Sequence, residues 1–304
     1  MRGEPLELAG LIVRQNSTEP RVKTDLSQSL RRTNRFIAKF EWIHSSSGIR
    51  KTPFQKRAWK SPGQCNTLRP AVNKPKLNLQ TTTLWEYPSQ HYGKQMQGDQ
   101  EYKGATPSYV IWNLLSRYTR EGDTVLDPMC GSGTTLDVAT ELKRIPLAYD
   151  LVPFRPDILQ SDARHLPIKN ETVDFVFIDP PYSTHIDYSD HKNCIGKLDA
   201  QGSEYYEAME QVFTELFRVL KNRRYLALYV SDSFKKGKPF SPIGFELFSL
   251  LRKQFKPVDI ISVVRHNRTL KRNHWHTAAV EGNYFLRGFN YLFIFKKEIE
   301  DKVK

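Results

Sequence analysis

Cysteine is scarce in this sequence, with three residues among 304, at Cys65, Cys130 and Cys194. Their odd number and scattered positions exclude a disulfide framework, and the lack of paired spacings argues against a zinc knuckle. Three histidines, at 266, 274 and 276, lie close together, but no cysteine or acidic residue stands near them. We therefore predict that the chain binds no metal.

Long apolar runs are also lacking. No stretch of about 18 apolar residues is present, which excludes a membrane-spanning helix. The start of the chain, residues 1–5, lacks the apolar core of a secretory signal peptide. We expect a cytoplasmic protein with no membrane partner, associated with the nucleoid if the source is bacterial or archaeal.

Acidic residues are too few to balance the basic ones. The 46 Lys and Arg residues outnumber the 33 Asp and Glu residues, which gives a net charge of +13. Residues 1–76 hold 16 of the basic and 5 of the acidic residues, so most of the excess lies there. Residues 1–80 show no sustained helical or strand period. We predict that residues 1–83 form a basic, partly irregular extension that contacts nucleic acid or docks on the core.

A glycine-rich loop follows the apolar segment 124–126, and it reads Asp-Pro-Met-Cys-Gly-Ser-Gly-Thr-Thr. Its glycines allow close approach of a ligand, and the helix predicted to begin after them offers free N–H groups. A dinucleotide fingerprint would need a third glycine where Leu136 stands, so NAD is disfavoured. The loop residues predicted to bind a cofactor are Asp127, Pro128, Cys130, Gly131, Ser132, Gly133 and Thr134.

Two further carboxylates end predicted strands. Asp150 closes the segment 145–149, and its spacing from the loop suits a carboxylate that accepts hydrogen bonds from a ribose diol. Asp162 follows the segment 157–161 and is predicted to take an adenine amino group, either itself or through the amide of Ala163.

A second motif, Asp179-Pro180-Pro181-Tyr182, directly follows the apolar strand predicted over 173–178. A carboxylate and a proline-fixed carbonyl can accept the two N–H bonds of an exocyclic amino group, and Tyr182 offers a face for base stacking. Because both motifs follow strands, we expect them at the same carboxyl edge of a parallel sheet. Catalysis there would rest on positioning and electrostatics.

Together, in this order, the two motifs resemble the S-adenosylmethionine-dependent DNA amino-methyltransferases, which methylate adenine N6 or cytosine N4. The resemblance spans roughly residues 84–297. It implies S-adenosylmethionine as cofactor and Asp179, Pro180, Pro181 and Tyr182 as catalytic residues. The segment before helix 111–115 is similar to the family's helical cofactor motif, which adds Thr106 and Pro107 to the cofactor site.

The resemblance also implies the fold, a Rossmann-like α/β domain over residues 84–299 with a seven-stranded, mostly parallel sheet. We count strands over 124–126, 145–149, 157–161, 173–178, 225–230, 258–264 and 290–295, with an amphipathic helix over 204–220.

DNA is the favoured partner, with adenine N6 slightly favoured as acceptor. A restriction endonuclease is a candidate protein partner. The open alternatives are methylation of a base amino group in RNA, methylation of a glutamine amide in protein, and an inactive methyltransferase-like protein that binds nucleic acid. The loop 265–276 mixes four cations with Trp275 and is a further candidate for strand contact.

Overall fold

The computed structural model of the chain describes residues 77–299, apart from 183, 185, 187, 234–238 and 267, and the side chains of 268 and 269 are also outside the description. The predicted basic extension over 1–83 therefore lies outside the described residues, except for its last seven positions.

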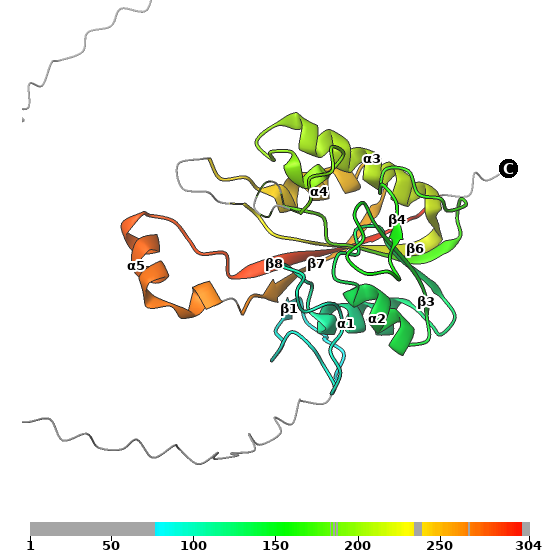
Figure 1. Cartoon of the computed structure of the whole chain (residues 1–304), viewed down its shortest axis with the longest axis horizontal. Coiled ribbons are helices and arrows are strands. Elements are labelled where there is room, and N and C mark those ends of the chain that lie inside the picture. The colour runs from blue at the N-terminus through cyan, green and yellow to red at the C-terminus, as the bar shows by residue number, and fades with distance from the viewer. Residues whose placement is uncertain are drawn as a thin grey trace, which may run out of the picture. The chain divides into compact units, whose positions relative to one another are not determined.

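The described residues form one mixed sheet of eight strands with helices on both faces (Figure 1). Across the sheet the order is β1 (Leu84–Trp85), β7 (Lys256–Val264), β8 (Phe289–Lys296), β6 (Leu220–Val230), β5 (Val173–Ile178), β2 (Thr124–Asp127), β3 (Ile145–Asp150) and β4 (Leu159–Gln160). Strand β8 is antiparallel to both of its neighbours, and the other paired strands are parallel.

The predicted number of seven strands is wrong, because β1 adds an eighth. Its residues Leu84 and Trp85 pair in parallel with Ser262 and Val263 of β7. Two residues are too short to show the alternation by which a strand is recognised in a sequence. The other seven strands overlap the predicted segments, although β6 begins at Leu220, ahead of the predicted 225–230, and β7 pairs antiparallel with β8.

The helices cover the two faces of the sheet. Helices α1 (Ser108–Tyr118) and α2 (Thr134–Glu141) pack on one face, and α3 (Ser203–Val219) and α4 (Ile243–Leu251) pack on the other (Figure 1). The central strand β5 is buried along its whole length, because Phe175 and Phe177 face the first layer while Val176 and Ile178 face the second. The predicted apolar stripe of α3 is in the core, with Met209, Val212 and Leu216 fully buried.

A buried cation closes the carboxyl end of α3. Lys297 is 2% exposed, and its Nζ donates hydrogen bonds to the carbonyl oxygens of Phe217 and Leu220 and to Glu171, at 2.8, 2.8 and 2.9 Å. The ammonium group thereby satisfies carbonyls that the end of the helix leaves without partners. Lys297 thus ties the last residues of the sheet to α3.

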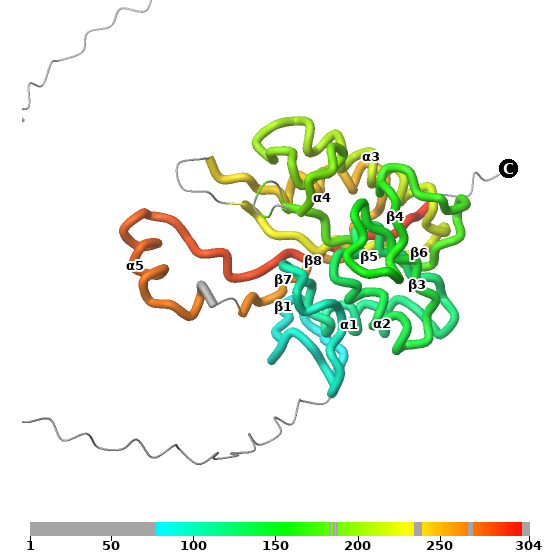
Figure 2. The backbone as a smooth tube through the Cα atoms, viewed as in Figure 1, coloured from blue at the N-terminus to red at the C-terminus, as the bar shows by residue number. Residues whose placement is uncertain are grey.

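The topology gathers polar residues at one edge of the sheet. Asp127 and Asp150 end β2 and β3, Asp179 follows β5, and Arg265 follows β7. Asn290 joins them because β8 runs in the opposite direction, so its first residues pair with the last residues of β7. Between β7 and β8 the chain leaves the sheet over residues 265–288, which carry the short helices η4 (Arg268–Lys271) and α5 (Asn273–Glu281) (Figure 2).

Candidate active site

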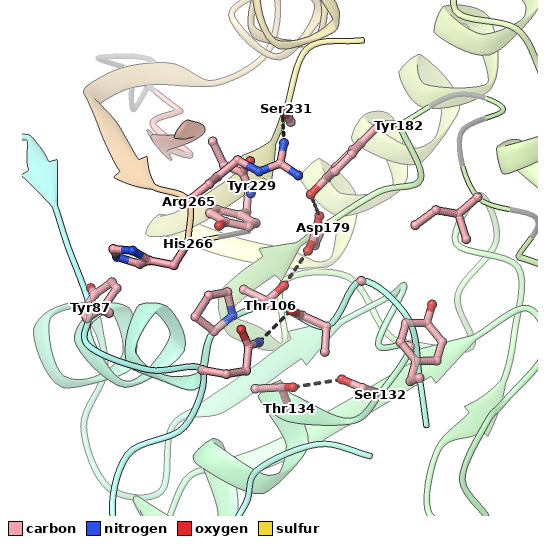
Figure 3. Close-up of a pocket in the computed structure, with 18 of the residues that line it drawn as sticks. Tyr87, Thr106, Ser132, Thr134, Asp179, Tyr182, Tyr229, Ser231, Arg265 and His266 are labelled. Atoms are coloured by element: carbon pink, nitrogen blue, oxygen red, sulfur yellow. Dashed lines mark hydrogen bonds between the residues drawn. The ribbon is translucent and has the colours of Figure 1, made fainter. Parts of the chain in front are cut away.

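A pocket of about 910 Å³ opens at this edge of the sheet (Figure 3). The glycine loop and the segment 104–107 line one part of it, and the ends of β6, β7 and β8 line another. Asp179 and Tyr182 of the second motif line the same pocket. The two sequence motifs, which are far apart along the chain, are therefore brought together as predicted.

The glycine loop has a backbone conformation that favours glycine at two positions. Gly131 and Gly133 have φ angles of +50° and +82°, which non-glycine residues seldom adopt. Gly133 is the N-cap of α2, so the first N–H groups of that helix are directed toward the loop. Beside them, the hydroxyls of Ser132 and Thr134 lie 2.9 Å apart and both residues line the pocket.

Asp127 and Cys130 are buried at the base of this loop. Burial raises the pKa of Asp127 to about 7, although hydrogen bonds from the Thr135 side chain and the Met129 amide oppose the shift. Burial also raises the pKa of the Cys130 thiol well above its usual value. The thiol is therefore neutral and unsuited to act as a nucleophile.

Asp150 braces the glycine loop from β3. Its Oδ2 accepts a 2.9 Å hydrogen bond from the Gly131 amide, and its Oδ1 accepts one of 3.1 Å from the amide of Val152. Burial raises its pKa. Asp150 is not among the residues that line the pocket, although the Gly131 whose amide it binds is. Its predicted contact with a ribose stays a prediction.

Asp162 is held by a neighbouring cation. Arg164 donates to both carboxylate oxygens, with Nε to Oδ1 at 2.9 Å and Nη2 to Oδ2 at 2.6 Å. Burial works against ionisation here, but these bonds outweigh it and lower the pKa of Asp162. Ala163 is 5% exposed and belongs to the hydrophobic core. Neither residue lines the pocket, and their predicted contact with adenine stays a prediction.

Tyr102 is a residue of this site that the sequence analysis missed. A Cβ added to Gly131 would lie 2.7 Å from Cζ of Tyr102, so the ring occupies the space that the glycine leaves open. Its ring packs edge-on against Phe154, with centroids 5.4 Å apart. Burial, followed by the negative charge of Asp150, raises the pKa of its hydroxyl. No motif marks Tyr102, because its role depends on a fold contact with a distant loop.

Asp179 is held by two hydroxyl groups (Figure 3). Thr106 Oγ1 donates to its Oδ2 at 2.5 Å, and the hydroxyl of Tyr182 donates to its Oδ1 at 2.6 Å. Burial raises the pKa of Asp179 to about 7, while these two bonds and the nearby positive charge of Arg265 oppose the shift. Thr106, predicted to bind the cofactor, thus contacts the carboxylate of Asp179, the residue predicted to be catalytic.

The two prolines of the motif are held by the core. Pro180 is buried, and the carbonyl oxygen of Pro181 accepts a 2.9 Å hydrogen bond from the hydroxyl of Tyr205 on α3. This bond fixes the turn after β5 and occupies the Pro181 carbonyl. The carbonyl of Pro180 is the one next to Asp179.

The other end of the pocket is formed by the ends of β6 and β7 and the start of β8. Arg265 donates to Ser231 at 3.1 Å, and the Asn290 side chain forms a hydrogen bond with Tyr229. Among the described residues, three buried atoms of the pocket lining have no hydrogen-bond partner: the Tyr87 hydroxyl, Nε of Arg287 and Oδ1 of Asn290. These side chains come from segments that carry no recognisable motif.

The parallel strands with a glycine loop and an acidic motif at their carboxyl edge define the class of the protein. This arrangement of strands, glycine loop and acidic motif is the one that the resemblance to the amino-methyltransferases predicts. A family model described as DNA methylase, of the N6 and N4 amino type, matches residues 11–158 and 173–302. The chain therefore belongs to this family, and S-adenosylmethionine is its methyl donor.

Solved structures resemble the chain in fold alone. TrmN from Thermus thermophilus is 19% identical with a TM-score of 0.44, and the match covers 64% of this chain and 50% of that protein. A SAM-dependent methyltransferase from Methanosarcina mazei is 16% identical, with a TM-score of 0.39 and coverage of 62% and 98%. Geranyl diphosphate C-methyltransferase from Streptomyces coelicolor is 12% identical, with a TM-score of 0.42 and coverage of 63% and 76%. No curated protein sequence matches the chain.

The residues present fit this cofactor. The two glycines with positive φ let the loop backbone turn at positions where an added Cβ would collide with Tyr102 or Arg155, and the start of α2 supplies N–H donors that a bound ligand can use. In the part of the chain that the structure describes, no group of three or more His, Cys, Asp or Glu residues could hold a metal ion. No helix among the described residues has the length and apolar character needed to cross a membrane.

Proposed function

We propose that the protein transfers a methyl group from S-adenosylmethionine to an exocyclic amino nitrogen of a base in DNA, with adenine N6 favoured over cytosine N4. The observation that carries the proposal is the position of Asp179. Its carboxylate lies in the same pocket as the glycine loop, with both oxygens oriented by hydroxyl donors from Thr106 and Tyr182.

The acceptor amine would be held by the catalytic motif. A carboxylate oxygen of Asp179 and the carbonyl of Pro180 accept the two N–H bonds, which leaves the nitrogen lone pair directed away from them. The Pro181 carbonyl already accepts the Tyr205 hydroxyl, so the Pro180 carbonyl is the backbone acceptor left next to Asp179. Tyr182 is oriented by its bond to Asp179 and offers its ring to the base.

The cofactor would be held by the glycine loop. Three residues of this loop line the pocket, namely Gly131, Ser132 and Thr134, and Gly133 lies between them in the chain. Asp150 accepts a hydrogen bond from the amide of Gly131 and so fixes its position. When bound there, S-adenosylmethionine supplies an electrophilic methyl group and leaves as a neutral thioether. We assign the ribose contact to Asp150 and the adenine contact to Asp162 and Ala163, as the sequence predicts.

The raised pKa of Asp179 suits this carboxylate to accept a proton from the methylated amine. A methylated amino nitrogen must lose one proton to become neutral, and a nearby base receives that proton most efficiently when its pKa lies near the working pH. Burial brings the pKa of Asp179 to about 7, against the hydrogen bonds from Thr106 and Tyr182 and the charge of Arg265. Asp179 therefore both positions the amine and accepts its proton.

The rival functions differ in the acceptor. The same catalytic motif can present an amino group of a base in RNA or a glutamine amide, and an inactive relative would bind nucleic acid without transfer. The intact pair of hydroxyl bonds on Asp179 favours an active site over an inactive one. The excess of 46 basic over 33 acidic residues favours a polyanionic substrate over a protein. We place such an enzyme in the cytoplasm, where a restriction endonuclease would be its partner.

One experiment separates these functions. The protein is incubated with DNA, RNA and a protein mixture in the presence of S-adenosylmethionine labelled in the methyl group, and the products are digested and analysed by mass spectrometry. N6-methyladenine or N4-methylcytosine in DNA supports the proposal and fixes the base. Label confined to RNA or protein overturns the DNA assignment, and cofactor binding without any labelled product indicates an inactive relative.

A further inference from the structure

We propose that residues 265–288, here named the excursion, form a nucleic-acid-binding finger that holds the strand next to the methylated base. The inference rests on the proposed function, because it takes the polynucleotide as substrate. Figure 1 shows the excursion extending away from both helical layers, with α5 at its outer end. Its role must therefore be sought outside the core of the domain.

The excursion is a continuation of the β7–β8 pair. The last register pair of these strands joins Val264 to Phe289, and the amide of Arg265 then donates a 2.9 Å hydrogen bond to the carbonyl of Gly288. This bond closes the neck of the excursion on the sheet. At the outer end, the His276 ring lies 2.8 Å from the carbonyl oxygen of Leu270, which links α5 to η4. The excursion is thus a built element, anchored at the edge where the pocket opens.

The excursion has little core of its own. In α5 only Ala279 is buried, and Val280 and Phe285 are 83% and 84% exposed. A helix exposed on nearly all sides gains little from packing on its own domain, so a partner is the usual reason for it. Trp275 is 40% exposed on the same helix. Two exposed aromatic rings on one element suit stacking with bases.

The charge of the excursion selects a polyanion. Residues 265–288 contain five Lys and Arg residues and one acidic residue, Glu281, a net charge of +4. Residues 77–304 together carry 30 basic and 28 acidic residues, so without the excursion they have a net charge of −2. The net positive charge of residues 77–304 therefore comes from the excursion, which borders the pocket. Combined with exposed rings, this charge fits a nucleic-acid strand, which offers phosphates and bases in alternation.

The excursion is also continuous with the pocket. Arg265, His266, Leu270, Lys271, Leu286 and Arg287 all line it. Arg287 lies over the ring of Phe240, with its Cζ 5.2 Å from the ring centroid. A base in the pocket, next to Asp179, would thus have its flanking nucleotides beside these cations. We assign phosphate contacts to Lys271 and Arg272, and stacking on a flanking base to Phe285.

Binding of a fluorescein-labelled DNA duplex to the full-length protein tests the proposal, with anisotropy measured at several salt concentrations. Phe285→Ala should raise Kd about tenfold, because it removes a stacking surface. The double variant Lys271→Ala/Arg272→Ala should make the negative slope of log K against log salt shallower by about 1.8, because two phosphate contacts are lost. Both variants should keep the wild-type affinity for S-adenosylmethionine in calorimetry, which also shows that they fold.

Matched controls lie on α4 and directly after it, and none of them lines the pocket. Phe245→Ala removes a Phe that is 53% exposed, and Arg252→Ala/Lys253→Ala removes two adjacent cations. These controls should bind DNA as the wild type does. The proposal is overturned if the excursion variants keep the wild-type Kd and salt slope. It is also overturned if the control variants lose as much affinity for DNA as the excursion variants do.

The methyl-transfer assay separates this proposal from the proposed function. If the wild-type protein methylates DNA and the excursion variants bind DNA as the wild type does, only the proposed role of the excursion is overturned. Loss of binding in those variants, in a protein that methylates no nucleic acid, would support the excursion and count against the proposed enzyme.

Discussion

Thr106 and Asp179, which are 73 positions apart in the sequence, are joined by a hydrogen bond of 2.5 Å from the Thr106 hydroxyl to the Asp179 carboxylate. The bond links the segment before α1 to the motif that follows β5. It favours the ionised carboxylate, since a donor stabilises negative charge. Thr106 is therefore a positioning residue for the group that would bind the amine.

The pH dependence of methyl transfer follows from this bond. Burial raises the pKa of Asp179 to about 7, against the bonds from Thr106 and Tyr182 and the charge of Arg265, so turnover should fall as the pH drops below about 7 and the carboxylate gains a proton. Thr106→Val removes one stabilising donor and should move this acidic limb to higher pH. A pH–rate profile of both proteins measures the shift, and identical limbs would contradict it. Thr106→Ser keeps the hydroxyl and should retain the wild-type profile.

Removing the charge of Asp179 should raise the stability of the folded protein and lower its methyl-transfer activity. With a folded pKa of about 7 and an unfolded pKa of roughly 3.9, the folded protein binds the extra proton between these values, so its stability falls as the pH rises through this window. Asp179→Asn carries no such charge. It should therefore unfold at a higher temperature than the wild type at pH 8, by roughly 2–4 °C for each kcal/mol gained, while methyl transfer falls at least about a hundredfold.

The control for this variant is Asp259→Asn, at an exposed position of β7. It should leave both the unfolding temperature and turnover near wild-type values. The quantity to compare is the unfolding temperature of Asp179→Asn minus that of the wild type. If this difference is the same at pH 8 as at pH 5, burial of the Asp179 charge costs little.

Gly131→Ala should weaken cofactor binding by at least about tenfold in calorimetry. The added Cβ would meet the Tyr102 ring at 2.7 Å, and the φ of +50° is unfavourable for alanine. Gly122→Ala is a matched control, because Gly122 has a φ of +82° but nothing within 4 Å of an added Cβ. It should lower stability by about 1 kcal/mol and leave cofactor affinity unchanged. A second change, Tyr102→Ala, should restore part of the affinity lost in Gly131→Ala; no recovery would place the defect in the backbone instead.

The basic extension gives a prediction of its own, although residues 1–76 lie outside the described residues. Deleting residues 1–60 should raise the Kd for DNA and flatten its salt dependence, because the slope is about −0.9 for each phosphate neutralised on duplex DNA. Affinity for S-adenosylmethionine should stay similar. A destabilised or insoluble truncation would instead indicate that the extension docks on the core, and a soluble truncation with wild-type Kd and slope would reject both roles.

The sequence predicted those parts of the site that lie close together along the chain. Gly131, Gly133 and Asp179 stand in short motifs next to strands, and strand ends at a common edge bring the motifs together without further information. The strands of the parallel core were predicted because apolar runs such as residues 175–178 of β5 mark strands buried on both faces.

Contacts between segments that are far apart in the chain could not be predicted from the sequence. The bond from Thr106 to Asp179 and the packing of Tyr102 on Gly131 depend on how segment 102–107 crosses the sheet edge. Asn290 reaches the pocket only because β8 is inserted antiparallel between β6 and β7. No pattern of periodicity or spacing encodes such a meeting for a single sequence.

Lys297 sets the C-terminal boundary at which this domain can be cut. Its ammonium group satisfies the carbonyls of Phe217 and Leu220, at the point where α3 gives way to β6. A chain cut after Lys296 would keep the whole of β8 but leave two buried carbonyls without a donor, at a cost of about 1–3 kcal/mol each. Such a chain should express poorly or unfold at a lower temperature, whereas one cut after Ile299 should behave as the full chain does in thermal unfolding. A boundary drawn at the last strand would therefore fail by a single residue.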